Sequence, residues 1–192
     1  GYVEEFIMST KSNKVFSSGS LMLYPFNQGS NEGGASMTID NKTLYYTKCT
    51  RNSLGYNNCD IYYVEKKDNG WSDVNRFSSD ICNENTWESQ PSVSSDGKTI
   101  IFASDRSGGY GNIDLYEINY IDGQWSSPVN LGSKINSVNQ EKSPFLHADG
   151  QTLFFSSTRF PSLGGFDIFY SRKDSLGDWQ DPINIGYPIN SS

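Results

Sequence analysis

Three aspartates in this sequence recur at nearly equal spacing and are the first residues to consider as chemical groups. Asp60, Asp114 and Asp167 each stand at the start of a short apolar run, and Arg106 and Arg159 precede the second and third of them by eight residues. Carboxylates in this setting could hold a metal ion or act as general acids and bases. Their recurrence favours a structural role instead, in which each accepts hydrogen bonds from loop backbone and pairs with the arginine across its hairpin. We therefore expect no catalytic or metal-binding residue among them.

The other side chains that could take part in chemistry are typical of turns rather than of a reaction site. Asp40, Asp96 and Asp149 stand beside Asn or Gly, a pairing typical of tight turns. His147 is the single histidine, and no nucleophile motif accompanies it, so a polar position near a turn is favoured over a general base. No zinc-ligand spacing, phosphate-binding loop or nucleophile elbow occurs, and no cofactor is expected. Glycoside hydrolysis by a pair of carboxylates is kept as an alternative, although nothing in the sequence singles out one pair.

The elements that position these residues are set by an internal repeat. Trp71, Trp125 and Trp179 are each 54 residues apart, and Glu32, Glu88 and Glu141 keep nearly the same spacing. A period of this length, filled with short apolar runs and turn residues, indicates a repeat architecture. Residues that recur in every repeat are therefore candidates for structural roles, and residues that break the repeat are better candidates for function.

One repeat unit contains four expected strands. Asp96-Gly97 between two apolar runs predicts a hairpin turn, because glycine accepts a positive φ without steric cost. The runs are short and rich in aromatic and β-branched residues, which suits strands, and no useful helical periodicity occurs. Four-stranded units at this period predict an all-β fold, a β-propeller; a β-solenoid is the alternative, although its rungs are usually shorter. The expected strands lie near 90–94 and 99–104, at 113–120, and near 124–130.

The repeat also predicts how the chain is divided. Phe16 stands where Trp125 stands two repeats later, so the N-terminal stretch is expected to form the outer half of a blade, with Phe16 buried as the tryptophans are. Propellers usually close with about four to eight blades. Three and a half blades would leave edges and flanks open, so we expect remaining blades from the same longer chain or from another copy. The predicted units are a half blade at 1–30 and full blades at 31–84, 85–137 and 138–192.

Composition narrows the class of partner. Aromatic residues make up 14% of the chain and supply large apolar surfaces for packing between blades. The net charge of −7 argues against nucleic acid and against an anionic membrane surface. No apolar run is long enough to span a bilayer, so no direct membrane insertion is expected, and no signal peptide is visible.

The three cysteines bear on the compartment. Cys49 ends an expected second strand and Cys59 begins the third, so the two flank one hairpin loop and a disulfide between them is geometrically reasonable. Such a bond predicts an oxidising compartment, whereas two reduced cysteines would fit a cytosolic protein. Cys82 is left over without a role.

Several segments resemble a known family. The run from Pro91 to Gly109, Pro-Ser-Val-Ser-Ser-Asp-Gly-Lys-Thr-Ile-Ile-Phe-Ala-Ser-Asp-Arg-Ser-Gly-Gly, is similar to the TolB-type WD-like β-propeller repeat. Further segments resemble propellers of Bacteroidetes cell-envelope proteins, which often sit beside a tetratricopeptide region and an OmpA-like domain; some members belong to type IX secretion and gliding machinery. The resemblance covers nearly the whole chain and implies a periplasmic or outer-membrane-associated protein. Peptidoglycan binding is not carried over, because the OmpA-like part is absent. The segments are 125–136, 141–145, 164–169 and 184–190.

The residues that break the repeat gather on long loops expected at one end of the propeller. Exposed aromatic side chains on rigidly supported loops are typical of recognition surfaces. The alternative is that they cap their loops locally. The leading hypothesis is a non-catalytic interaction propeller that binds protein in the envelope; the alternative is a glycan-binding module or propeller hydrolase with a site near the central channel. The expected interaction residues are Tyr56, Trp87, Tyr110, Phe160 and Leu163.

Overall fold

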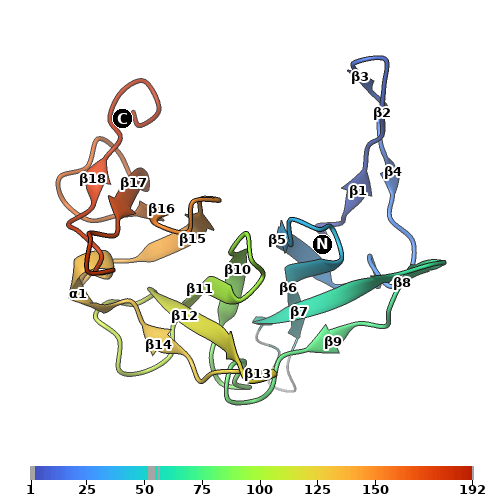
Figure 1. The fold of residues 1–192 in the computed structure, drawn as a ribbon, viewed down its shortest axis with the longest axis horizontal. Helices are drawn as coiled ribbons and strands as arrows, with labels where there is room; N and C mark the ends of the chain where they lie inside the picture. The colour runs from blue at the N-terminus through green and yellow to red at the C-terminus, as the bar shows by residue number, and fades with distance from the viewer. Residues whose placement is uncertain (1–2, 52–54, 56, 192) are drawn as a thin grey trace.

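The computed structural model describes residues 3–51, 55 and 57–191 and forms an open arc of antiparallel sheets (Figure 1). In this described part, the one helix, α1 (Gly132–Ile135), is a single turn. The first strand of each large sheet lies on the concave side of the arc, and the short outer strands lie on the convex side (Figure 1). The all-β prediction is confirmed: the chain forms three β-propeller blades and half of another.

The second blade shows why the sequence folds in this way. Along β11, Ile100 and Phe102 face the first blade, and Ile101 and Ala103 face the third. All four are buried because a blade is covered on both sides, which explains the continuous apolar run. Its strands are β10 (Glu88–Val93), β11 (Thr99–Ser104), β12 (Asp114–Ile121), β13 (Gln124–Trp125) and β14 (Val129–Asn130), with β12 pairing both outer strands.

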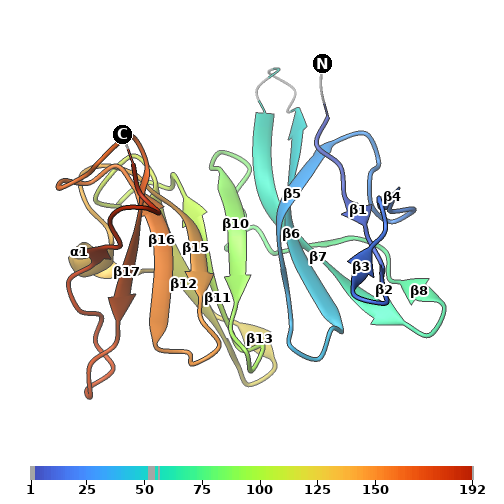
Figure 2. The same ribbon diagram turned by 90° about the horizontal axis from the view of Figure 1, so that it is seen from above.

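The other sheets repeat this order. The first strand of every blade carries a β-bulge where its register with the second strand shifts. The turns that join first and second strands lie at the end of the molecule opposite the long loops (Figure 2). The first blade has β5 (Asn31–Met37), β6 (Thr43–Arg51), β7 (Asn57–Lys67), β8 (Gly70–Trp71) and β9 (Asn75–Arg76); the third has β15 (Glu141–Leu146), β16 (Thr152–Ser157), β17 (Asp167–Arg172) and β18 (Ile183–Asn184); the half blade has β1 (Ile7–Met8), β2 (Lys11–Ser12), β3 (Val15–Phe16) and β4 (Ser20–Leu21).

The fourth strand differs from the prediction, because it is broken in two. In the second blade, Ser126 Oγ accepts a hydrogen bond from the Asn119 N–H at 3.0 Å and donates one to the Ser127 carbonyl at 3.1 Å. Pro128 follows and has no N–H to donate to a ladder. Backbone pairing with β12 ends at Ser126, whose N–H still donates to the Asn119 carbonyl at 2.8 Å, and resumes at Val129, so a single predicted strand becomes β13 and β14.

The repeat tryptophans are half-buried, and each packs against the blade that precedes it. The Trp125 ring lies 5.8 Å from that of Phe77 in the first blade, and the Trp71 ring lies 5.7 Å from that of Phe26 in the half blade. Trp179 packs against the cluster between the second and third blades. The prediction was wrong for Phe16, which is 63% exposed. Phe16 belongs to the half blade, so the described chain has no preceding blade to cover it.

Candidate functional site

Two of the three repeat aspartates, Asp114 and Asp167, hold the long loops in place. The Asp114 carboxylate accepts hydrogen bonds from the backbone N–H groups of Tyr110 at 2.5 Å and Gly111 at 2.9 Å, and from Asn130 Nδ2 at 2.8 Å. A carboxylate held by loop amides closes the loop and leaves few free lone pairs for a metal or a substrate. Asp167 does the same with the Leu163 N–H at 2.5 Å and Asn184 Nδ2 at 2.8 Å.

The arginines differ from the sequence expectation, because they pair with the repeat glutamates and not with the aspartates. Arg106 Nη2 lies 3.1 Å from Glu88 Oε1 and donates to the Ile81 carbonyl of the preceding blade at 2.6 Å. Burial raises the pKa of Glu88, whereas hydrogen bonds from Thr86 and Ser104 and the arginine charge oppose that rise. The Asp114 carboxylate already accepts hydrogen bonds from loop amides, so Arg106 pairs with the buried carboxylate of Glu88 instead. Arg159 pairs in the same way with Glu141 at 3.2 Å.

The first blade pairs its repeat carboxylates with different cationic residues. Glu32 is buried but faces Lys48, whose Nζ lies 3.7 Å away, and Glu32 Oε1 has no hydrogen-bond partner among the described residues. In this blade Arg76 pairs with the repeat aspartate, donating to both carboxylate oxygens of Asp60 at 2.9 and 3.1 Å. The arginine therefore pairs with the aspartate Asp60, and no arginine in the described part of the chain pairs with the glutamate Glu32.

Cys82, which had no role in the sequence, occupies the place of a repeated asparagine. Asn136 clamps one residue of the third strand, accepting from the Leu115 N–H at 2.8 Å and donating to its carbonyl at 2.9 Å. Cys82 is 54 residues earlier and makes the same two contacts with Ile61, through Sγ at 3.4 and 3.8 Å. The thiol is therefore a structural substitute for an amide. Asn27 and Asn190 make the equivalent clamps on Phe6 and Ile168.

One group of side chains has donor types that could hold a metal. Ligand atoms of Asp60, Cys82 and Glu88 lie within 4.8 Å of one another, and all three residues are buried. Arg76 and Arg106 already neutralise the two carboxylates. Burial raises the pKa of the Cys82 thiol to about 12, which disfavours the thiolate that metals bind. The cluster is built as an ion-pair network rather than as an open coordination site.

The predicted interaction residues divide between exposed and packed positions. Phe160 is 90% exposed, and Leu163 on the same loop is 48% exposed. Tyr110 is half exposed and lines a shallow groove of about 460 Å³ with Leu131 and Trp179. Tyr56 lies outside the described residues.

Trp87 differs from the expectation of a free surface residue. It is half-buried and packs against the apolar cluster between the second and third blades. The Lys142 ammonium lies 5.7 Å from the centre of its ring and 5.5 Å from that of Phe166, so the lysine bridges two aromatic rings. Sequence reasoning missed Lys142 and Phe166, although an aromatic ring at a position that holds Ile113 and Cys59 in the other blades was a visible signal. We call Trp87, Lys142, Phe160, Leu163 and Phe166 the loop patch.

The predicted disulfide is confirmed. Cys49 and Cys59 are direct partners across β6 and β7, and their sulfur atoms are bonded. His147 lies at the turn end, where its Nδ1 accepts a long hydrogen bond from the Asp149 N–H. Among the described residues, no helix has the length and hydropathy that crossing a membrane requires.

Comparison with known proteins identifies the fold class as a TolB-like β-propeller. No protein-family model matches the sequence, and no curated protein sequence matches it. TolB from Acinetobacter baumannii superposes with a TM-score of 0.58 at 19% identity over 96% of this chain, and a putative TolB from Agrobacterium tumefaciens with 0.55 at 18% over 94%. This chain spans 42% and 60% of the length of those structures.

Propeller enzymes are also similar in fold. The GH93 α-L-arabinofuranosidase of Fusarium graminearum superposes with a TM-score of 0.52 at 13% identity, over 94% of this chain and 58% of that one. Identities this low show a shared fold alone. Function has to be argued from the residues of this chain.

Proposed function

We propose that this chain is a non-catalytic protein-interaction propeller of the bacterial cell envelope and that it binds a protein partner through the loop patch. The observation that carries the proposal is Phe160, a 90% exposed aromatic side chain at one end of the propeller. Large exposed aromatic groups on supported loops are typical anchors of protein interfaces. Leu163 and Phe166 are both nearly half exposed and extend the apolar surface along the same loop.

The loop that presents these side chains is held at several points. Asp167 accepts the Leu163 N–H, and the Pro161 carbonyl accepts Asn184 Nδ2 at 3.2 Å. At Gly164 an added Cβ would lie 2.5 Å from the Ser191 carbonyl oxygen, so the loop backbone packs tightly there. A loop that is already ordered loses little conformational entropy on binding, which favours affinity.

The absence of catalysis is part of the proposal and rests on how the carboxylates are used. Asp114 and Asp167 anchor loops, and Glu88 and Glu141 are neutralised by arginines. A general acid or base must reach a substrate. These repeated carboxylates are instead engaged within the fold.

Placement in the envelope is supported by the disulfide and by the sequence resemblance. A Cys49–Cys59 bond persists in an oxidising compartment. The resemblance to Bacteroidetes envelope propellers suggests a periplasmic or outer-membrane-associated complex, with type IX secretion machinery as one candidate. We also propose that further blades, from a longer chain or another copy, cover the outer flank of the third blade. There Ile189 is 63% exposed, whereas its repeat equivalent Ile135 is fully buried beneath a neighbouring blade.

Site-specific photo-crosslinking tests the loop patch. A photoreactive amino acid replaces Phe160 in one variant and Leu176 in a control. Leu176 is 85% exposed but lies in a turn after β17, at the other end of the propeller. We expect one discrete crosslinked protein from position 160 in envelope preparations, and no such product from position 176.

The purified partner then gives the quantitative test. Phe160→Ala should weaken its binding by about 2 kcal/mol or more, roughly thirtyfold, if the side chain is a central anchor. Leu176→Ala should leave the affinity unchanged. Crosslinking from position 176 alone, or equal affinity of the Phe160→Ala variant, would reject the loop patch as the binding surface.

A further inference from the structure

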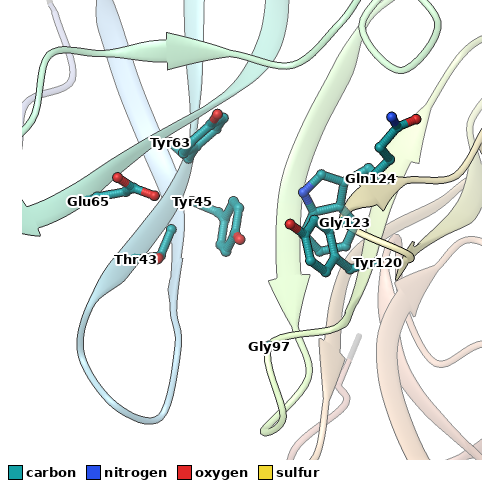
Figure 3. A pocket seen from close by; sticks show the side chains of 9 residues that line it. Thr43, Tyr45, Tyr63, Glu65, Gly97, Tyr120, Gly123 and Gln124 are labelled. Carbon is teal, nitrogen blue, oxygen red and sulfur yellow. The ribbon is translucent and has the colours of Figure 1, made fainter.

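A cleft between the first and second blades is lined by aromatic side chains that the repeat does not require. It lies at the turn end, away from the loop patch, and has a volume of about 350 Å³, in the range of small-molecule sites. Figure 3 shows two groups of side chains across it, from β6 and β7 on one side and from the β12–β13 hairpin on the other. We call it the tyrosine cleft, and its principal side chains are Tyr45, Tyr63, Glu65, Tyr120, Gln124 and Trp125.

The next blade interface shows that the fold does not need these tyrosines. The equivalent cleft between the second and third blades has a volume of about 290 Å³ and keeps the tryptophan, as Trp179. Strand register places Glu117 where the first blade has Tyr63, and Lys173 takes the place of Tyr120. The Lys173 ammonium lies 4.8 Å from the centre of the Trp179 ring, so that ring face is covered. Four aromatic rings therefore line the cleft at the first interface, whereas one lines the cleft at the second.

The tyrosine cleft combines ring faces with neutral polar groups. The Tyr120 and Trp125 rings are tilted with centres 5.3 Å apart, and Tyr120 is 44% exposed. Across the cleft, the Tyr45 and Tyr63 rings have centres 6.0 Å apart. The phenol hydroxyls are neutral at physiological pH and can both donate and accept, and burial raises the pKa of Tyr45 further, to about 12. Among the described residues, no hydrogen bond to protein occupies the three phenol hydroxyls.

We propose that the tyrosine cleft binds a neutral carbohydrate residue. The apolar C–H face of a sugar ring suits an aromatic ring face, and the sugar hydroxyls suit a carboxylate, an amide and phenols arranged around it. Glu65 and Gln124 supply the carboxylate and the amide on opposite sides of the cleft (Figure 3). The site lies between two blades and not in the central channel, which the first strands line.

The charge of the cleft favours a neutral ligand over a cation. Aromatic rings with one carboxylate could also hold a quaternary ammonium group. However, Glu65 Oε2 already pairs with Lys67 Nζ at 2.9 Å, so a cationic ligand would have to compete with this lysine for the carboxylate. A purely apolar ligand is disfavoured, because it would leave the hydroxyl, amide and carboxylate groups of the cleft without partners. A polyhydroxylated ligand satisfies both conditions.

Ligand-observed NMR with the intact chain tests the proposal. The probes are cello-, chito-, xylo- and manno-oligosaccharides, with choline as the cationic comparison, and calorimetry gives the affinity of any probe that binds. Tyr120→Ala removes one exposed ring and should weaken sugar binding at least tenfold. Tyr187→Ala is the matched control, because Tyr187 is 84% exposed and outside the cleft. Glu65→Gln keeps a hydrogen-bond acceptor and should reduce sugar affinity only a few fold.

The outcomes separate the possibilities. Binding of an oligosaccharide that Tyr120→Ala abolishes and Tyr187→Ala preserves supports the proposal. No binding by any of the four sugar classes at millimolar concentration rejects it. Choline binding that is lost in Glu65→Gln, without sugar binding, also rejects it and assigns a cation site instead. Sugar binding that is equally weakened by both tyrosine variants rejects the cleft as its location. None of these results depends on the loop patch, because Phe160 is unchanged in every variant.

Discussion

Replacing Arg106 by alanine is the sharpest test of the ion-pair network that joins the first two blades. Arg106 donates to Glu88 Oε1 and Ser104 Oγ, reaches the Ile81 carbonyl of the preceding blade, and lies over the Tyr116 ring with 5.0 Å to its centre. Glu88 is fully buried. The substitution therefore leaves a buried carboxylate without its counter-ion and removes one hydrogen bond between blades.

The expected cost follows from this geometry. Breaking a buried ion pair by removing one partner costs about 3–5 kcal/mol, because the other charge stays buried. For a chain of this size that corresponds to a fall in Tm of roughly 6–20 °C. Urea denaturation followed by tryptophan fluorescence gives the free energy of unfolding. Lys134→Ala is the control: its partner is Asp181, both side chains are exposed, and the loss should stay below about 1 kcal/mol.

The pH dependence distinguishes a charge effect from a loss of packing. Burial raises the pKa of Glu88 in the folded protein above its unfolded value. Its contribution to stability is therefore fully present below the unfolded pKa and is lost as pH rises through the folded pKa. Removing Arg106 should raise the folded pKa further, so the variant should lose more stability at neutral pH than at acidic pH. Adding Glu88→Gln should flatten that difference. A loss below about 1 kcal/mol at neutral pH, or an equal loss at both pH values, would refute the reasoning.

Two further predictions concern the cysteines. Thiol titration of the denatured, unreduced chain should find one reactive thiol, Cys82, and replacing Cys49 and Cys59 together by alanine should cost about 2–3 kcal/mol; three thiols would contradict the bond. Cys82→Asn should remain within about 1 kcal/mol of the parent because asparagine fills this position in other blades, whereas Cys82→Ala should cost about 1–3 kcal/mol by leaving the buried Ile61 N–H without its partner. Equal stability of these two variants by urea denaturation would refute the clamp.

Much of the fold could be predicted because the repeat displays its periodicity openly. Asp96-Gly97 fixed a turn, and Gly97 indeed has a φ of +72°. The apolar run Ile100 to Ala103 indicated a strand, whereas its burial on both sides became visible only in the structure. The break between β13 and β14 was less visible, because serine side chains there compete with the strand ladder only when a particular backbone geometry brings them close.

The site was harder to predict, because sequence spacing does not show which partner a charged side chain selects. Arg106 stands eight residues before Asp114, yet it binds Glu88, which precedes it by 18 residues. Two carboxylates compete for the arginine. Asp114 already accepts hydrogen bonds from loop amides, whereas the buried Glu88 carboxylate is stabilised more by a counter-ion. Similarly, Trp87 broke the repeat as a surface residue would, but tertiary packing buries half of it.

The departures from the repeat fall into two physical kinds, and only one kind points to function. Some are compensated within the fold: Cys82 makes the contacts of an asparagine, and Arg76 replaces the asparagine that serves Asp114 in the next blade. Others leave an aromatic side chain exposed. Phe160 extends into solvent, and Tyr120 is 44% exposed although its ring lies 5.3 Å from that of Trp125; a lysine stands in its place at the next interface. An exposed aromatic ring on an ordered scaffold gains most of its stabilisation only when a ligand covers it. The uncompensated departures are therefore the residues at which binding should be sought, at the loop end for a protein and in the tyrosine cleft for a sugar.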